Sequence, residues 1–147
     1  MSADIAAQVA QRFLAALEHM DTEAALACFG DDAVQEMPFA PRGFPDRLVG
    51  KAELRHQYGG LSAAYAGMRF DVSETRPMAD PEWVLLEYRG SIVQRDGSRC
   101  DNRYAGLFRV VDGLIVLFRE YSDPLILQRS FGTRLADPFP LPVNGSS

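Results

Sequence analysis

Two Asp-Gly turns, which join three long β-rich runs, constrain the fold of this chain more than any other feature. Asp96-Gly97 lies between residues 83–93 and 100–111, and Asp112-Gly113 lies between residues 100–111 and 114–122. Asp-Gly between such runs favours a β-hairpin, because glycine adopts a positive φ at little cost. The second half of the chain is therefore predicted to form an antiparallel meander.

The first half of the chain has the period of helices. Apolar side chains recur every three or four positions over residues 5–20, which predicts an amphipathic helix. Asp21 and Gly30 are start and stop signals around a short second helix. A third helical pattern covers residues 54–65, and Gly59-Gly60 within it predicts a kink. Three helices before a meander make the expected fold class α+β.

Two further strands complete the predicted fold. Residues 34–37 form a short β-rich segment that ends at Pro38, and we interpret it as an edge strand. Apolar and polar side chains alternate with a period of two from residue 68, which is typical of a strand.

The 147 residues fit one domain, which we place at residues 1–128. Residues 129–147 are predicted to be a Pro- and Gly-containing C-terminal tail whose last residues are mobile.

Charge and composition narrow the choice of partners. The net charge is −5, and Lys and Arg are interleaved with Asp and Glu, so no nucleic acid partner is expected. No apolar run reaches the roughly 20 residues that span a bilayer, and the N-terminus lacks a signal-peptide pattern. We therefore expect no membrane partner and a cytoplasmic location. Histidines at metal-ligand spacing and a phosphate-binding glycine loop are both missing, so we expect no cofactor.

Three segments resemble recurring motifs of the nuclear-transport-factor-two-like superfamily. Residues 29–34 resemble F-x-D-D-A-V, residues 106–115 resemble G-x-F-x-x-x-D-G-x-I, and residues 119–123 resemble R-[DE]-Y-x-D. The superfamily includes ketosteroid isomerases, scytalone dehydratase, limonene epoxide hydrolase and the SnoaL-like polyketide cyclases. The resemblance implies a cone-shaped curved antiparallel sheet packed against three N-terminal helices, with a hydrophobic pocket inside.

A local resemblance to limonene epoxide hydrolase implies candidate catalytic residues. In a placement without gaps, the acid that protonates the epoxide falls on Glu120. The Asn and Tyr that hold the attacking water fall on Glu36 and Val34. The Arg and the water-activating Asp fall on Glu87 and Arg89, so these two charges are exchanged. The resemblance keeps the acid position but does not carry over the hydrolase mechanism.

Strand alternation also predicts that Glu120 lies at the pocket. Leu114, Val116, Phe118 and Glu120 share one face of the last strand, so Glu120 follows an apolar row in which Phe118 is a candidate substrate contact. Removal from water raises the pKa of a carboxyl group, which suits a general acid or base near neutral pH. The alternative is that Glu120 is a structural partner of an arginine.

The other charged candidates each allow two interpretations. Glu87 and Arg89 share a strand face and would form a pocket network with Glu120; alternatively they face outward, because the opposite face of their strand is apolar. Glu36 precedes Met37-Pro38. Two interpretations of Glu36 follow. In the first it points inward, as a base that activates water or abstracts a proton; in the second it is a solvated charge at the sheet edge.

Three uncharged candidates complete the predicted site. Asn102 and Tyr104 share a strand face and could bind a ligand oxygen; alternatively they are a cross-strand pair and a core tyrosine. His56 lies in the third helix, which flanks the pocket lid in the resembled fold, so it is a candidate ligand contact. These three residues, with Val34 and Phe118, form the predicted substrate-binding set.

The sequence supports two functions. The first is a cofactor-independent general acid/base enzyme, of the epoxide hydrolase, isomerase or cyclase type, acting on a small apolar molecule that resembles a polyketide or terpenoid. The second is a non-catalytic small-ligand-binding or dimerisation module. The acid positions of ketosteroid isomerases fall on Met37 and near Gly106, which disfavours a steroid isomerase of that type. An apolar outward face predicts a homodimer; it comprises Leu86, Tyr88, Ile92, Ile115, Leu117 and Tyr121.

Overall fold

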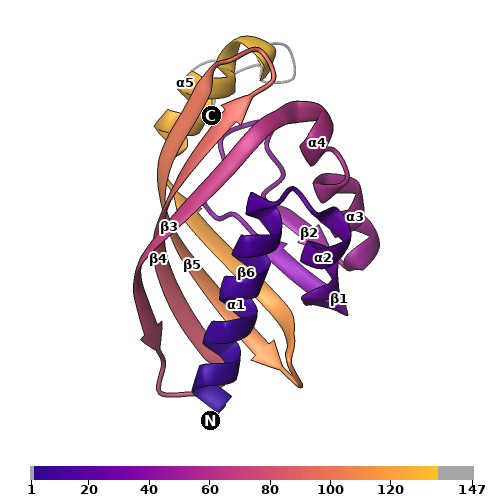
Figure 1. Ribbon diagram of the computed structural model, residues 1–147, viewed down its shortest axis with the longest axis vertical. Helices are drawn as coiled ribbons and strands as arrows, with labels where there is room; N and C mark the ends of the chain where they lie inside the picture. Colours follow the sequence, from indigo (N-terminus) through magenta and orange to yellow (C-terminus); the bar gives the residue numbers. More distant parts are fainter. Residues whose placement is uncertain (1, 136–147) are drawn as a thin grey trace, which may run out of the picture.

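Six strands form one curved sheet, in the order β2-β1-β6-β5-β4-β3, and α1 lies across its concave side (Figure 1). The computed structural model describes residues 2–135. The elements are α1 (Ser2–Glu18), α2 (Thr22–Ala27), β1 (Phe29–Glu36), β2 (Arg47–Val49), α3 (Lys51–Tyr58), α4 (Leu61–Ala64), β3 (Tyr65–Pro77), β4 (Trp83–Gln94), β5 (Arg99–Val111), β6 (Leu114–Ser122) and α5 (Pro124–Leu135). The predicted α+β cone with N-terminal helices is confirmed.

Both Asp-Gly pairs form the hairpins of the predicted meander. Asp112 and Gly113 have φ of 52° and 76°, the two positive values that a two-residue type I′ turn needs. The loop at Asp96-Gly97 is longer: Gln94 and Ser98 flank it, and the Gln94 N–H donates to the Ser98 carbonyl at 2.8 Å. The antiparallel pairing of β4 with β5 and of β5 with β6 follows from these local turns and confirms the meander. β3 pairs antiparallel with β4 after a connection through residues 78–82.

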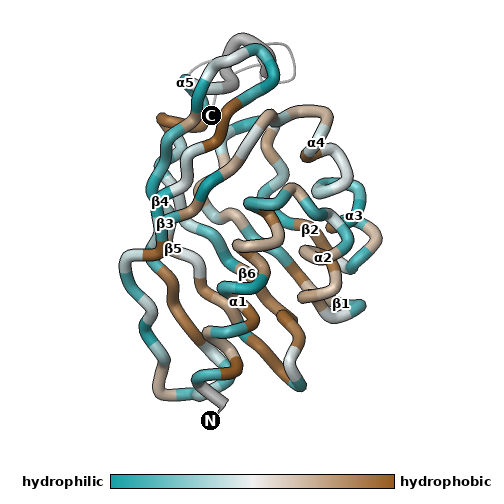
Figure 2. The backbone as a smooth tube through the Cα atoms, in the orientation of Figure 1, coloured by the Kyte–Doolittle hydropathy of each residue, from teal (hydrophilic) through white to brown (hydrophobic). Residues whose placement is uncertain are grey.

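One aromatic side chain of α1 holds this helix on the sheet. Phe13 is fully buried, and its ring packs edge-on against Phe29, Phe118 and Phe108 at centroid distances of 5.1, 5.3 and 6.2 Å. Burial of a phenylalanine contributes about 2–3 kcal/mol, and each such aromatic pair adds about 1 kcal/mol. Hydrophobic stretches of the long strands lie beside α1 in Figure 2. This core fills one end of the cone and leaves a cavity towards the other.

The predicted edge position of β1 is wrong, because a short strand covers it. β2 pairs antiparallel with β1, with Val49 opposite Val34, and β1 pairs parallel with β6 on its other side. The three residues of β2 follow a loop rich in Pro and Gly and are too few to show a period. The predicted kink in the third helix is a break: α3 ends at Tyr58, and α4 starts at Leu61.

The C-terminal helix α5 was not predicted, and it crosses the proposed domain boundary at residue 128. A buried side chain anchors its start. The Asn102 amide donates to the Asp123 carbonyl at 3.1 Å and accepts the Asp123 N–H at 3.2 Å. Asp123 in turn caps the helix by accepting the Leu125 N–H at 2.9 Å. The rest of the predicted tail, residues 136–147, lies outside the described residues.

A bulge in β6 corrects part of the predicted face assignment. Ile115 pairs with Val110, but the next pair is Leu117 with Arg109, so Val116 is an extra residue. The bulge turns Ile115 inward, and Ile115 is fully buried, as is Leu86. Tyr88 is also buried, and Ile92 lines the cavity on the inner face, so four of the six residues of the predicted dimer face point inward. The homodimer itself stays a prediction.

Within residues 2–135, every helix is too short or too polar to span a membrane.

Candidate functional site

A cavity of about 150 Å³ lies between the concave side of the sheet, α1, α3, α4 and α5. Most of its wall is apolar. Among the described residues that line it, Glu120 is the only one with a carboxyl group, and none is Lys, Arg or His. The lining residues are Leu17, Gln35, Met37, Phe44, Leu48, Gln57, Tyr58, Leu61, Tyr65, Met68, Phe70, Ile92, Tyr104, Phe118, Glu120 and Leu127. Such a cavity fits a molecule about the size of one ring.

Glu120 reaches this cavity because β6 alternates regularly after its bulge. Phe118 and Glu120 both point inward, whereas Arg119 between them points out. The Tyr88 hydroxyl donates a hydrogen bond to Oε2 of Glu120 at 2.8 Å. Desolvation raises the pKa of Glu120 from 4.5 to about 7, although the Tyr88 hydrogen bond acts in the opposite direction. Glu120 is therefore divided between its acid and carboxylate forms near neutral pH.

A glycine makes the contact between Tyr88 and Glu120 possible. Gly106 lies directly between Leu86 on β4 and Glu120 on β6 in the strand register. A Cβ on Gly106 would lie 3.1 Å from Cε1 of Tyr88 and 3.2 Å from Cε1 of Phe118. The Tyr88 ring therefore occupies the space above Gly106, and its hydroxyl extends across β5 to the carboxylate.

Three tyrosines surround the Glu120 carboxylate. Burial raises the pKa values of Tyr58, Tyr88 and Tyr104, and the negative charge of Glu120 raises each of them further. All three hydroxyls therefore stay protonated at neutral pH and can donate hydrogen bonds. Tyr58 donates to Oε1 of Gln35 at 2.5 Å, which leaves the amide nitrogen of Gln35 at the cavity wall. The cavity thus combines one carboxyl group with several neutral donors.

The comparison with known protein families agrees with this geometry. The model of the SnoaL-like domain matches residues 10–118 of the chain. The chain belongs to the SnoaL-like domain family. This family lies within the nuclear-transport-factor-two-like superfamily, so the resemblance predicted from three sequence motifs is confirmed.

Individual relatives of this SnoaL-like chain span most of its length. The uncharacterized protein YesE of Bacillus subtilis is 26% identical over 129 residues, which cover 86% of this chain and 87% of YesE. A B. subtilis crystal structure, named as a proposed isomerase, has a TM-score of 0.83 and 25% identity, covering 90% of this chain and 96% of its own. An M. tuberculosis LEH-like epoxide hydrolase has a TM-score of 0.65 and 26% identity, covering 91% and 97%.

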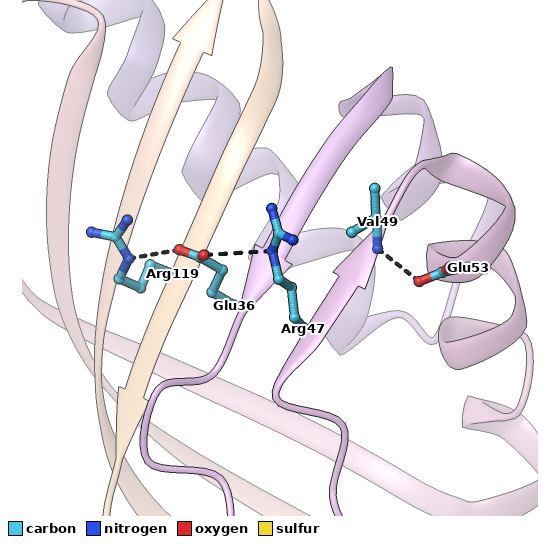
Figure 3. Close-up of polar contacts among 5 residues, drawn as sticks. All are labelled: Glu36, Arg47, Val49, Glu53 and Arg119. Carbon is cyan, nitrogen blue, oxygen red and sulfur yellow. Dashed lines mark hydrogen bonds and ion pairs between the residues drawn. The ribbon is translucent and has the colours of Figure 1, made fainter.

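The structure places Glu36 outside the SnoaL-like cavity. Its carboxylate accepts a hydrogen bond from Nε of Arg119 at 2.9 Å and lies 3.7 Å from Nε of Arg47, so it sits between two arginines (Figure 3). The buried residues of this part of β1 are Ala33 and Gln35. Gln35, which lies between Val34 and Glu36, is the residue of this segment that lines the cavity. Neither Val34 nor Glu36 lines the cavity, and Glu36 is the outward charge of the two predicted alternatives.

The predicted network of Glu87, Arg89 and Glu120 does not form. Glu87 and Arg89 are exposed, and Glu87 pairs with Arg76 across β3 and β4 at 3.6 Å. The residues of β4 that turn inward are Leu86 and Tyr88. The outward interpretation holds because the core buries the other face of β4, which carries Val84, Leu86 and Tyr88.

The predicted substrate-binding residues divide into two groups. Tyr104 and Phe118 line the cavity, where the Tyr104 ring stacks on Tyr88 at 5.1 Å. Asn102 and His56 do not: Asn102 is buried but holds the start of α5, and His56 is exposed on α3. The inward row of β5 continues past Tyr104 to Asn102, but the chain covers that end with α5, which the sequence did not predict.

Three residues of the site were not among the predicted site residues: Gln35, Tyr58 and Tyr88. Tyr58 follows Leu54 by one helical turn, so helical periodicity puts it on the buried face of α3. Tyr88 follows Leu86 by two positions, so it lies on the same inward face of β4. Within residues 2–135 there is no group of three His, Cys, Asp or Glu side chains with the arrangement of metal ligands, and the expected lack of a cofactor stays a prediction.

Proposed function

We propose that this protein is a cofactor-independent enzyme in which Glu120 transfers a proton within a small, mostly apolar carbonyl compound, as an isomerase or cyclase does. One observation carries the proposal: among the described residues, the cavity lining has a single carboxyl group, with a pKa raised to about 7, and no cation. A base of this kind is poised to take up and return a proton near neutral pH.

The proposed reaction begins when ionised Glu120 removes a proton from a carbon next to the substrate carbonyl. The electrons of the C–H bond move to the carbonyl oxygen and form an enolate. In an isomerisation, protonated Glu120 then returns the proton to another carbon. In a cyclisation, the enolate carbon attacks a second carbonyl carbon of the same molecule, and Glu120 returns its proton to the oxygen of that carbonyl. No net oxidation or reduction occurs in either case.

Neutral donors in the cavity support the enolate oxygen. The hydroxyl of Tyr104 and the amide nitrogen of Gln35 both belong to the lining, and neither makes a hydrogen bond with another described residue. Neutral donors suit this role because a cation beside Glu120 would lower its pKa and weaken it as a base. Donors held in a cavity with little water stabilise developing negative charge more strongly than water does.

Epoxide hydrolysis is a second candidate, and the 26% identity to the M. tuberculosis LEH-like epoxide hydrolase favours it. In that reaction the acid form of Glu120 would protonate the epoxide oxygen while water attacks a ring carbon. The described lining offers neither an arginine nor a second carboxylate to activate the water. The geometry therefore supports a reaction with a single proton-transfer group better.

The test compares wild-type protein with Glu120→Gln on two substrate panels. Monocyclic ketones and β-dicarbonyl compounds are incubated in D2O, and deuterium uptake and rearranged products are followed by NMR; monocyclic epoxides are incubated in H2¹⁸O. We expect deuterium uptake with wild type, a loss of at least about 100-fold in Glu120→Gln, and little change in the control Glu36→Gln. Labelled diol formation would favour the epoxide hydrolase, and binding without reaction on both panels would favour a ligand-binding module.

A further inference from the structure

A second hollow lies on the face of the sheet opposite to Glu120. We call it the outer groove; it has a volume of about 550 Å³, and its lining combines three strands with the first turn of α5. The lining residues are Asp71, Arg89, Gly90, Ser91, Arg99, Asp101, Asn102, Arg103, Asp123 and Ile126. Small-molecule sites commonly have volumes of roughly 300–1,000 Å³, so the outer groove is large enough for a metabolite.

Two arginines in the outer groove face each other, and neither is paired with another of the described residues. Arg89 on β4 lies directly opposite Arg103 on β5, and both side chains are exposed. Like charges at opposite positions of an antiparallel pair repel each other. Within the described part of the chain, neither guanidinium group makes an ion pair or a side-chain hydrogen bond. Within residues 2–135, the pair is therefore a concentration of positive charge with no carboxylate bound to it.

The carboxylates of the outer groove are already engaged elsewhere. Asp71 lies opposite Arg89 in the register, but its carboxylate is 3.7 Å from Nε of Arg69 on its own strand. Asp101 accepts a hydrogen bond from Ser91 at 2.7 Å, which lowers the pKa of Asp101. Asp123 accepts an N–H of the first turn of α5 at 2.9 Å. An external anion is thus the group that can satisfy both arginines.

We propose that the outer groove binds a small organic oxyanion, a carboxylate or a phosphate monoester, between the guanidinium groups of Arg89 and Arg103. The planar guanidinium fork of arginine matches the paired oxygens of these groups and binds them with two parallel hydrogen bonds. Ile126 lies in the same lining and provides apolar surface for the remainder of the ligand.

The outer groove is separate from the proposed reaction site. Arg89 and Arg103 point away from the neighbouring Tyr88 and Tyr104, which are buried on the inner face beside Glu120. Substitution of either arginine therefore tests anion binding without removing a group from the cavity. The proposal stands or falls independently of the reaction that Glu120 performs.

The experiment is an NMR titration of ¹⁵N-labelled protein at constant pH and ionic strength. Three probes are compared: sodium benzoate, phenyl phosphate and inorganic phosphate, each exchanged against sodium chloride. We expect saturable shifts of the Arg89 and Arg103 signals, and at least tenfold weaker binding in Arg103→Gln. The matched control is Arg109→Gln, on the same face of β5, because Arg109 already pairs with Glu82 at 2.9 Å.

Each outcome decides the proposal. Saturation by benzoate or phenyl phosphate, but not by inorganic phosphate, identifies an organic anion with an apolar part; equal binding of all three probes reduces the site to one for the oxyanion alone. The proposal is overturned by shifts that never saturate, by unchanged affinity in Arg103→Gln with an unchanged melting temperature, or by sedimentation data showing that a second copy of the chain covers the groove and excludes the probes.

Discussion

Glu120 and Glu36 are the same residue type on neighbouring strands, yet the sheet gives them opposite environments. Glu36 lies opposite Arg119 in the register, one residue from Glu120, and faces outward between two arginines. Glu120 faces the cavity, where its hydrogen-bond partner is the neutral Tyr88. Desolvation without a cation raises the pKa of Glu120 to about 7. The comparison teaches that the face of the sheet on which a glutamate lies, rather than its residue type, makes it a candidate catalyst.

The largest expected effect is a loss of stability with rising pH that depends on Glu120. Its pKa is about 7 in the folded protein and 4.5 in the unfolded chain. Between these values the folded state retains a proton that the unfolded state has lost, so the free energy of unfolding falls as the pH rises through this window. A difference of about 2.5 pKa units corresponds to roughly 3 kcal/mol.

Urea unfolding at pH 5 and pH 8 measures this effect. We expect Glu120→Gln to lack this part of the pH dependence and to exceed wild type in stability at pH 8, whereas Glu36→Gln should keep the wild-type dependence. Equal slopes of stability against pH in wild type and Glu120→Gln would show that Glu120 is not desolvated.

The next effect concerns the gap above Gly106. In Gly106→Ala the new methyl group would lie 3.0–3.2 Å from ring carbons of Phe108, Tyr88 and Phe118, so at least one ring must move. Overpacking of this kind costs about 1–3 kcal/mol. We also expect a loss of activity, because displacement of Tyr88 disturbs its hydrogen bond to Glu120.

Gly67→Ala is the matched control for this substitution, since a Cβ on Gly67 meets no atom within 4 Å. Thermal unfolding and turnover are compared for the two variants. A fully active and stable Gly106→Ala would mean that Tyr88 does not need the space above this glycine.

The smallest effect is expected at Glu36. Its side chain is 28% exposed, and exposed ion pairs contribute only about 0–1 kcal/mol. Glu36→Gln should therefore lower stability slightly, and high salt should reduce the difference. Chemical denaturation at low and high ionic strength measures it; a loss of activity comparable with that of Glu120→Gln would contradict the assignment of Glu36 to the outer face.

Local chemistry made much of the fold predictable. The turn at Asp112-Gly113 needs only two residues with positive φ, and the α1 stripe depends on helical spacing, so neither requires knowledge of distant contacts. The position of Glu120 followed from its alternation with Phe118. Earlier in the same strand, the extra residue Val116 changes which side chains face inward. No local sequence pattern predicts this bulge.

The remainder of the site depended on contacts between distant segments. Whether Gln35 or Glu36 turns inward is set by the pairing of β1 with β6, and a strand of this length does not show its phase in sequence. The partnership of Tyr88 with Glu120 joins residues 32 positions apart through the gap at Gly106. Asn102 was assigned to the pocket because the helix that it anchors, α5, was not predicted.

The most direct test of the account is the pKa of the Glu120 carboxyl group, measured by ¹³C NMR of protein labelled at glutamate and assigned through Glu120→Gln. We predict a pKa of about 7 in wild type. In Tyr88→Phe the pKa should be higher, because the Tyr88 hydrogen bond lowers it in the wild-type protein. A wild-type value near the ordinary 4.5 would contradict the account, since Glu120 would then be a solvated carboxylate like Glu36.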